Sequence, residues 1–246
     1  MKKLLLLLPL SISLLSAADW PRWLGPNGTG VSNEADWQVG LGFSALSVAD
    51  GRLFTMGHDG IKQDGKETVW CLDAVTGKEL WSDSYKAQLV DYLHEGGPCA
   101  TPTVDGETVY SISKDGRLNA YLAAKGTLLW SKNMMTAAGM KKPPEWGFAG
   151  SPYVLDDLLI IEADYTFALK KNSGKEVWRS KKYRHAYGSP VAFPLEGKTW
   201  IGHNPGFDFD VIDRIVNFNI SNFDLKNLKL KFRNVNLIDT RHLSLL

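Results

Sequence analysis

Polar and apolar residues alternate over short stretches in the middle of the chain, and the stretches are separated by glycines and acidic residues. Between residues 99 and 133 this pattern predicts four strands, at about 99–105, 108–115, 117–124 and 127–133. The three breaks between these strands carry dipeptides that favour tight turns, namely Asp105-Gly106, Asp115-Gly116 and Lys125-Gly126. The pattern therefore predicts an antiparallel sheet of four short strands.

Tryptophans recur at nearly equal spacing along the same part of the chain. Trp81, Trp130 and Trp178 are 49 and 48 residues apart. A glycine lies four residues before each of these tryptophans, at Gly77, Gly126 and Gly174. Glycine can supply the positive φ that a turn needs. A tryptophan at this fixed distance lands at the same place in every repeat and can pack on the neighbouring repeat.

The opening of each repeat also recurs, as Thr101-Pro102, Ser151-Pro152 and Ser189-Pro190. Proline suits the first position of a strand because no ladder donor is required there. Four strands per unit at a period of 40 to 50 residues indicate the blades of a β-propeller. A β-sandwich with coincidental tryptophan spacing is the alternative.

These segments resemble the repeats of pyrroloquinoline-quinone-type (PQQ-type) propellers, whose docking motif is Ala-x-Asp-x-x-Thr-Gly-x-x-x-Trp. Residues 71–81 match it with only Cys71 in place of alanine, residues 120–130 keep the frame without the Asp and Thr, and residues 168–178 have Ser in place of Thr. The resemblance covers roughly residues 40 to 203. It implies an all-β, partial β-propeller of about three and a half to four four-stranded blades. It is specific for the repeat and does not fix an activity.

The N-terminus has the order of a secretory signal. Lys2 and Lys3 precede the apolar residues 4–15, and small residues follow at 16–18. We expect residues 1–18 to be a signal peptide cleaved after Ala18, residues 19–41 to be an N-terminal arm, and residues 42–203 to form the blades. This predicts a periplasmic or secreted protein with no membrane span after cleavage.

The sequence changes character after residue 203. All nine tryptophans lie at or before position 200 and all 23 glycines at or before 206. We therefore expect residues 204–246 to be a divergent tail foreign to the repeat, produced by a shifted reading frame or a truncated gene. A divergent but authentic capping segment is the alternative. Four units do not reach the seven or eight blades that the resemblance implies for a closed ring.

Charge and composition exclude several functions. With 28 Lys and Arg against 27 Asp and Glu, the chain has no basic excess for a dedicated nucleic-acid binder. Two cysteines cannot form a four-thiolate zinc site, and they are not the adjacent pair that stacks on the cofactor in PQQ-type dehydrogenases. Whether Cys71 and Cys99 form a disulfide is left open.

No histidine pair has metal-ligand spacing, so we expect each histidine to lie in a loop or on the surface: His58, His94, His185, His203 and His242. The Asp-rich residues 58–67 are expected to form an elongated turn, since they lack the ligand pattern of a calcium loop. Trp146 and Phe148 lie before the third unit, where they either form a binding surface or pack between blades.

These observations predict an exported, non-catalytic PQQ-like repeat propeller that acts as a binding or assembly scaffold. A protein partner or a small ligand would bind on a propeller face. No catalytic residues, no metal site and no cofactor are expected, and the cofactor-binding residues are unknown. The alternative is a fragment of a quinoprotein-like oxidoreductase that uses PQQ with calcium. The residues singled out are structural anchors: Gly77, Trp81, Gly126, Trp130, Gly174 and Trp178.

Overall fold

A computed structural model describes residues 39–89, 91, 95–183, 185–195, 198–203 and 238–239. The predicted signal peptide, the arm up to residue 38 and nearly all of the predicted tail lie outside the described residues. Among the described residues, no helix is long and apolar enough to cross a membrane.

The described chain forms four antiparallel sheets, each built from consecutive strands. Blade 1 contains β1 (Ser47–Ala49), β2 (Arg52–His58), β3 (Lys66–Asp73) and β4 (Glu79–Lys86). Blade 2 contains β5 (Thr103–Asp105), β6 (Thr108–Ile112), β7 (Arg117–Leu122) and β8 (Thr127–Asn133), followed by the short helix α1 (Met134–Ala137). Blade 3 contains β9 (Tyr153–Leu155), β10 (Leu158–Glu162), β11 (Thr166–Lys170) and β12 (Glu176–Arg179). Blade 4 contains β13 (Pro190–Leu195), β14 (Lys198–His203) and β15 (Ile238–Asp239).

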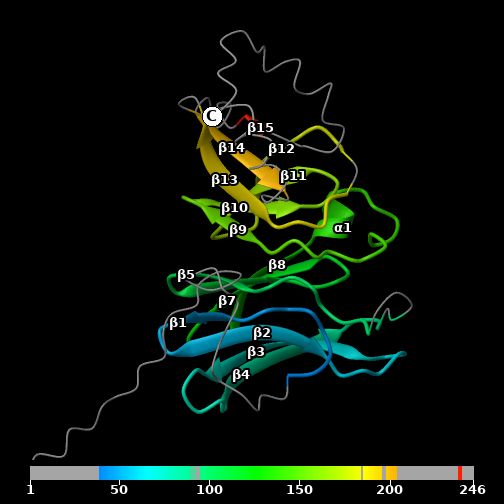
Figure 1. The fold of residues 1–246 in the computed structure, drawn as a ribbon, viewed down its shortest axis with the longest axis vertical. Helices are drawn as coiled ribbons and strands as arrows, with labels where there is room; N and C mark the ends of the chain where they lie inside the picture. Colours follow the sequence, from blue (N-terminus) through cyan, green and yellow to red (C-terminus); the bar gives the residue numbers. More distant parts are fainter. Residues whose placement is uncertain are drawn as a thin grey trace, which may run out of the picture.

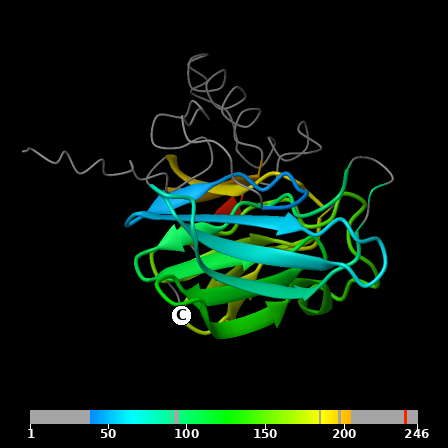
Figure 2. The ribbon, with the colours of Figure 1, turned by 90° about the horizontal axis from the view of Figure 1, so that it is seen from below.

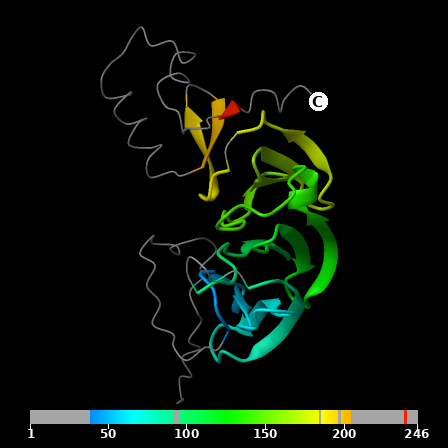
Figure 3. The ribbon, with the colours of Figure 1, turned by 90° about the vertical axis from the view of Figure 1, so that its right-hand side faces the viewer.

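The sheets are stacked in chain order (Figure 1), and Figure 2 shows them one behind another along the stack. Seen from the side, they fan out along an open arc (Figure 3). The first strands of neighbouring blades contact one another in series, β1 with β5, β5 with β9 and β9 with β13. The all-β, partial propeller predicted from the sequence is therefore confirmed. Within blade 2, β5 begins at Thr103 rather than at about 99, because Thr101 is bonded to blade 3 instead.

The hydrophobic core lies between the sheets. One cluster joins blades 1 and 2 through Phe54, Met56 and Trp81 on one side and Val109 and Tyr121 on the other. A second cluster joins blades 2 and 3 and includes Tyr110, Ile112, Leu159, Ile161 and Phe167. The inner strands bury both faces, so β6 and β10 are nearly continuous runs of buried residues.

Two of the three repeated tryptophans, Trp81 and Trp130, form a hydrogen bond to the next blade. The Trp81 indole Nε1 donates a hydrogen bond to the Ala123 carbonyl of blade 2 at 2.8 Å, and Trp130 donates to the Lys171 carbonyl of blade 3 at 3.1 Å. The rings lie on the turn glycines Gly126 and Gly174, where an added Cβ would come within 2.6 and 2.8 Å of the indole. Both glycines have positive φ, 67° and 65°. Glycine is therefore required at both positions for two reasons. The turn needs a positive φ, and the indole ring leaves no room for a Cβ.

The motif's first position also has a conformational role. In blades 1, 2 and 3 the pairing of the third and fourth strands shifts register directly after Cys71, Ala120 and Ala168. A bulge at this position increases the local twist of the outer strand. The small side chain of the motif therefore coincides with a repeated irregularity in each sheet.

Hydroxyl groups link the blades near their first strands. The Ala45 N–H donates to Thr101 Oγ1 at 3.2 Å, the Thr101 N–H to Ser151 Oγ at 2.9 Å, and the Ser151 N–H to Ser189 Oγ at 2.9 Å. Each of these hydroxyl residues precedes a proline. The Ser/Thr-Pro pairs thus contribute a bond between blades as well as a strand opening.

Substitution Ser151→Ala is expected to destabilise the protein by about 1–3 kcal/mol, because it leaves the N–H of buried Thr101 without its acceptor. Urea denaturation at neutral pH measures the loss. Ser82→Ala is the matched control, since Ser82 is exposed and bonds only to the exposed Glu79 within its own strand. Equal free energies of unfolding for the two variants would contradict a stabilising role of the hydrogen bond that the Ser151 hydroxyl accepts.

The expectation that every histidine lies in a loop or on the surface is wrong for His58. It is the last residue of β2 and only 1% exposed. Its Nε2 is 3.0 Å from the Ala87 carbonyl, and its Nδ1 accepts a bond from the Gly60 N–H. The strand extends to His58 because the His58 backbone pairs with Glu67 of β3 and with Leu41. His94 and His242 lie outside the described residues, and His203 ends β14.

The predicted turn at residues 58–67 is shorter than expected, since only residues 59–65 connect β2 to β3. The Asp59 carboxylate closes this turn by accepting hydrogen bonds from the N–H groups of Ile61 and Lys66 at 3.0 and 3.1 Å. The two cysteines are unbridged: Cys71 is buried and Cys99 half-buried. Burial raises the pKa of the Cys71 thiol to about 12.

Candidate functional site

The connections between strands gather charged residues at one end of the blades. The strands of each blade are antiparallel, so the turn between the second and third strands lies at one end of the blade. The fourth strand finishes at this same end, and the connector to the next blade leaves from it. We call this end the connector face. It comprises the turns 59–65, 113–116 and 163–165 together with the described parts of the connectors between blades. The docking glycines occupy the turns at the opposite end.

A buried carboxyl group, that of Glu67, lies where the connector face joins blades 1 and 2. Glu67 begins β3 and is 0% exposed. Its Oε1 accepts a long hydrogen bond from the Lys114 N–H, and its Oε2 accepts one from the Tyr85 hydroxyl, both at 3.4 Å. Burial, together with the nearby negative charge of Asp115, raises the pKa of Glu67 to about 7.

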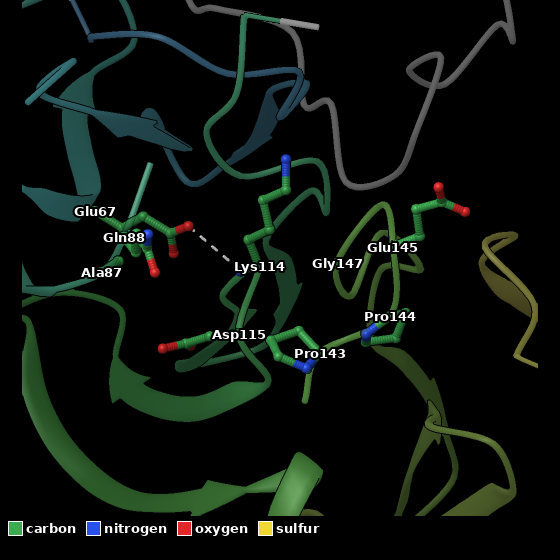
Figure 4. Close-up of a pocket in the computed structure, with 9 residues that line it drawn as sticks. All are labelled: Glu67, Ala87, Gln88, Lys114, Asp115, Pro143, Pro144, Glu145 and Gly147. Carbon is green, nitrogen blue, oxygen red and sulfur yellow. Dashed lines mark hydrogen bonds between the residues drawn. The ribbon is translucent and has the colours of Figure 1, made fainter. Parts of the chain in front are cut away.

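A cavity of about 190 Å³ opens beside Glu67. Figure 4 shows its lining residues, and the Lys114 ammonium points away from the Glu67 carboxyl group. The lining consists of Glu67, Ala87, Gln88, Lys114, Asp115, Pro143, Pro144, Glu145 and Gly147. It combines three acidic side chains with one lysine, and burial lowers the pKa of that lysine. The wall is therefore polar on one side and closed by prolines on the other.

A second buried carboxyl group, that of Glu162, ends β10 in blade 3. Its Oε1 accepts hydrogen bonds from the N–H groups of Asp164 and Ala186 at 3.0 and 3.2 Å. Its Oε2 is 3.2 Å from Nε2 of His185, whose Nδ1 is 3.4 Å from Oδ1 of Asp164. The distances permit ion pairs, but neither nitrogen of the buried His185 ring has a hydrogen bond of acceptable geometry.

Burial has opposite effects on these two groups. It raises the pKa of Glu162 to about 8 and lowers the pKa of His185. Both groups are therefore driven toward their neutral forms near neutral pH. The His185 ring stands edge-on to Phe148 and Tyr187, with ring centres 5.6 and 4.9 Å away.

Both acidic groups hold a connection in place. Glu67 of blade 1 binds the backbone of the Lys114 turn in blade 2, and Glu162 binds the backbone of the connector that leads to blade 4. Neutral or charged, a carboxyl group can accept these bonds. The arrangement therefore accounts for both acids as links between blades.

Trp146 and Phe148, for which the sequence left two roles open, separate in the structure. Phe148 is 1% exposed and packs on Gly116 of blade 2, where an added Cβ would lie 2.7 Å from its ring. Trp146 is 43% exposed on the connector face. Phe148 thus packs between blades, and only Trp146 presents a surface.

The described residues offer no site that can be assigned to PQQ with calcium, which the sequence resemblance makes an alternative. No group of three His, Cys, Asp or Glu side chains among them is placed to hold a metal ion. The cavity beside Glu67 is below the roughly 300–1,000 Å³ typical of sites for small organic ligands. The cysteines are separate free thiols, so they offer no disulfide face for a planar ring.

Sheets fanned along an arc and joined by a repeated indole-to-carbonyl bond define a PQQ-like repeat β-propeller. The family model described as outer membrane protein assembly factor BamB matches residues 22–145, just over half of the chain. The chain belongs to this family. No curated protein matches the chain.

Solved structures similar to this chain include quinohemoprotein alcohol dehydrogenase ADHIIG from Pseudomonas putida HK5. It is 22% identical, with a TM-score of 0.44, over 69% of this chain and 29% of that one. Quinohemoprotein alcohol dehydrogenase from Comamonas testosteroni is 18% identical, with a TM-score of 0.44, over 68% and 29%. A europium-containing methanol dehydrogenase is 12% identical, with a TM-score of 0.44, over 64% and 34%. The chain thus spans about a third or less of the length of these proteins.

Proposed function

We propose that the chain is an exported PQQ-like repeat propeller that serves as a binding or assembly scaffold and carries out no catalysis of its own. The observation that carries the proposal is the use of the buried acids. Glu67 and Glu162, which have the raised pKa values often found in catalytic acids, are engaged by backbone N–H groups that join blades. The family description, an outer membrane protein assembly factor, supports the same role.

The connector face is the surface we assign to a protein partner. Large apolar side chains are exposed on it at 39–54%: Leu41, Phe43, Ile61, Trp146 and Tyr187. Exposed aromatic residues above a polar surround are typical of the centre of protein interfaces.

Site-specific crosslinking tests this surface. A photoreactive phenylalanine analogue in place of Trp146 is expected to give a discrete crosslinked product in cells that export the protein. The same analogue in place of Val75 is the control, because Val75 is 61% exposed at the opposite end of the blades. Equal crosslinking from both positions would contradict a partner site on the connector face.

Reconstitution tests the catalytic alternative, in which the chain is part of a quinoprotein-like oxidoreductase. The purified protein is mixed with PQQ and calcium, and both quinone absorbance and dye-linked oxidation of alcohols and sugars are followed. The scaffold proposal predicts neither stoichiometric cofactor binding nor turnover. Stoichiometric binding with turnover would overturn it.

A further inference from the structure

The cavity beside Glu67 has a buried floor and an open mouth. Two of its lining residues, Glu67 and Ala87, are only 0% and 5% exposed. Three others, Gln88, Pro143 and Glu145, are exposed on the connector face. The cavity therefore leads from the surface that we assign to a protein partner down to the buried Glu67 carboxyl group.

Two carboxyl groups that line this cavity have no ion-pair partner among the described residues. Within the described chain, Glu67 accepts two hydrogen bonds, both long at 3.4 Å. The hydrogen bonds that Asp115 accepts come from residues two positions away in sequence. An ionised carboxylate has about four lone-pair sites, so both groups keep the capacity to accept further donors.

The lysine that lines the same cavity does not neutralise these acids. The Lys114 ammonium points away from the Glu67 carboxyl group (Figure 4). Burial also lowers the pKa of Lys114, which shows that an ammonium is poorly supported in this place. A guanidinium keeps its charge when buried and offers five N–H donors in one plane. The cavity therefore suits a guanidinium better than an ammonium.

We propose that this cavity receives an arginine side chain of the protein partner, with its guanidinium held between the carboxyl groups of Glu67 and Asp115. This occupant rests on the proposed function, because it belongs to the partner assigned to the connector face. The aliphatic stem of the arginine would lie against the rings of Pro143 and Pro144, which line the cavity. The exposed Trp146, in the same connector, would contact the partner surface around it.

The groups that face Glu67 come from several elements. They are His58 of β2, Tyr85 of β4, Cys99 and Glu145 of the connectors, and Lys114 and Asp115 of the 113–116 turn. Asp115 raises the pKa of Glu67 and Lys114 lowers it, but burial has the largest effect and sets the pKa at about 7. A bound cation favours the ionised carboxylate, so binding should tighten as the pH rises through 7.

Titration of Glu67 in the presence of methylguanidinium tests the chemistry of the cavity without the partner. The carboxyl ¹³C signals of the glutamate-labelled, full-length protein are followed from pH 5 to 9. The signals of Glu67 and Glu162 are assigned by their absence in the Glu67→Gln and Glu162→Gln variants. With about 50 mM methylguanidinium, the Glu67 midpoint should fall by about 0.5–1 pH unit.

Two controls make this titration decisive. Glu162 is an equally buried acid, but it accepts backbone hydrogen bonds and does not line the cavity, so its midpoint should not move. Tetramethylammonium has no N–H donor and should leave both midpoints unchanged. An unmoved Glu67 midpoint, equal shifts of Glu67 and Glu162, or an equal effect of tetramethylammonium would overturn the proposal, whether or not a partner binds.

Crosslinking in cells tests whether the partner supplies the cation. The photoreactive analogue at position 146 is combined with Glu67→Gln, or with Glu162→Gln as the matched control, and circular dichroism checks that both variants are folded. The crosslinked product should fall about threefold or more with Glu67→Gln and persist with Glu162→Gln. Equal yields from the two variants would overturn the arginine as occupant and leave the scaffold proposal standing. No product from the protein without either substitution would contradict the proposed function, and with it the assigned occupant.

Discussion

Replacing Trp81 by alanine is expected to lower the free energy of unfolding by about 3–5 kcal/mol. The side chain is 9% exposed and fills the space between blades 1 and 2. Its ring lies 6.0 Å from the Phe54 ring and 5.6 Å from the Tyr121 ring, measured between centres. The substitution removes these contacts and leaves the Ala123 carbonyl without its donor.

Urea denaturation of the two proteins, followed by circular dichroism, measures the difference. Trp146→Ala is the control, because it removes the same side chain from a position that is 43% exposed. A much smaller loss is expected for the control. If both variants lost the same stability, the interpretation of Trp81 as the joint between two blades would be wrong.

Glu67 is expected to make stability fall as the pH rises from about 4.5 to about 7. The folded protein holds the Glu67 proton up to a pKa of about 7, whereas the unfolded chain releases it near the ordinary value of 4.5. Within that window the folded state binds more protons, so each increase in pH favours unfolding. The stabilisation is complete below 4.5 and is lost above about 7. Its size is on the order of 3 kcal/mol.

The variant Glu67→Gln isolates this effect, since glutamine stays neutral at every pH. We expect the variant to gain stability relative to the wild type as the pH rises from 5 to 8. Burial of Glu162 also makes stability fall with rising pH, up to its pKa of about 8. This effect is the same in the variant and in the wild type, so it cancels in the comparison. Glu107→Gln is the control at an exposed position. A stability difference between Glu67→Gln and the wild type that did not change between pH 5 and 8 would refute the raised pKa of Glu67.

The sequence predicts the blades well because the repeat is encoded locally. A glycine, a tryptophan four residues later and alternating strands around them determine a hairpin, and three copies in register determine how hairpins follow one another. Within blade 1, the Asp73 carboxylate accepts bonds from the Val75 and Thr76 N–H groups, so the motif's turn is fixed by residues two and three positions apart. Such contacts are visible in sequence.

The connector face could not be predicted in the same way. Glu67 meets the Lys114 N–H across 47 positions of sequence, and Glu162 meets the Ala186 N–H across 24. In sequence, both are ordinary acidic residues at the ends of strands. Their burial depends on connectors from neighbouring blades, for which no local pattern exists. His58 was misplaced for the same reason, since the connector around Ala87 is what buries it.

The role of the Ser/Thr-Pro pairs was predicted only in part. Their prolines indicate a strand opening, but the hydroxyls of Ser151 and Ser189 accept bonds from residues 50 and 38 positions earlier. The difference at the third junction is likewise invisible in sequence, because Gly174 and Trp178 match the motif as well as the pairs in blades 1 and 2. Among the described residues, the buried Trp178 Nε1 has no hydrogen-bond partner. Only the geometry of the third junction separates them.

Exchange of the indole protons with deuterium tests the central claim most directly, namely that blade 1 is joined to blade 2, and blade 2 to blade 3, by the same tryptophan contact. The spectrum of the ¹⁵N-tryptophan-labelled protein is followed in deuterated buffer, with signals assigned through single Trp→Phe variants. Trp81 and Trp130 donate to the carbonyls of Ala123 and Lys171, so their indole protons are predicted to exchange orders of magnitude more slowly than that of the exposed Trp146. Exchange of Trp81 and Trp130 as fast as that of Trp146 would contradict the account.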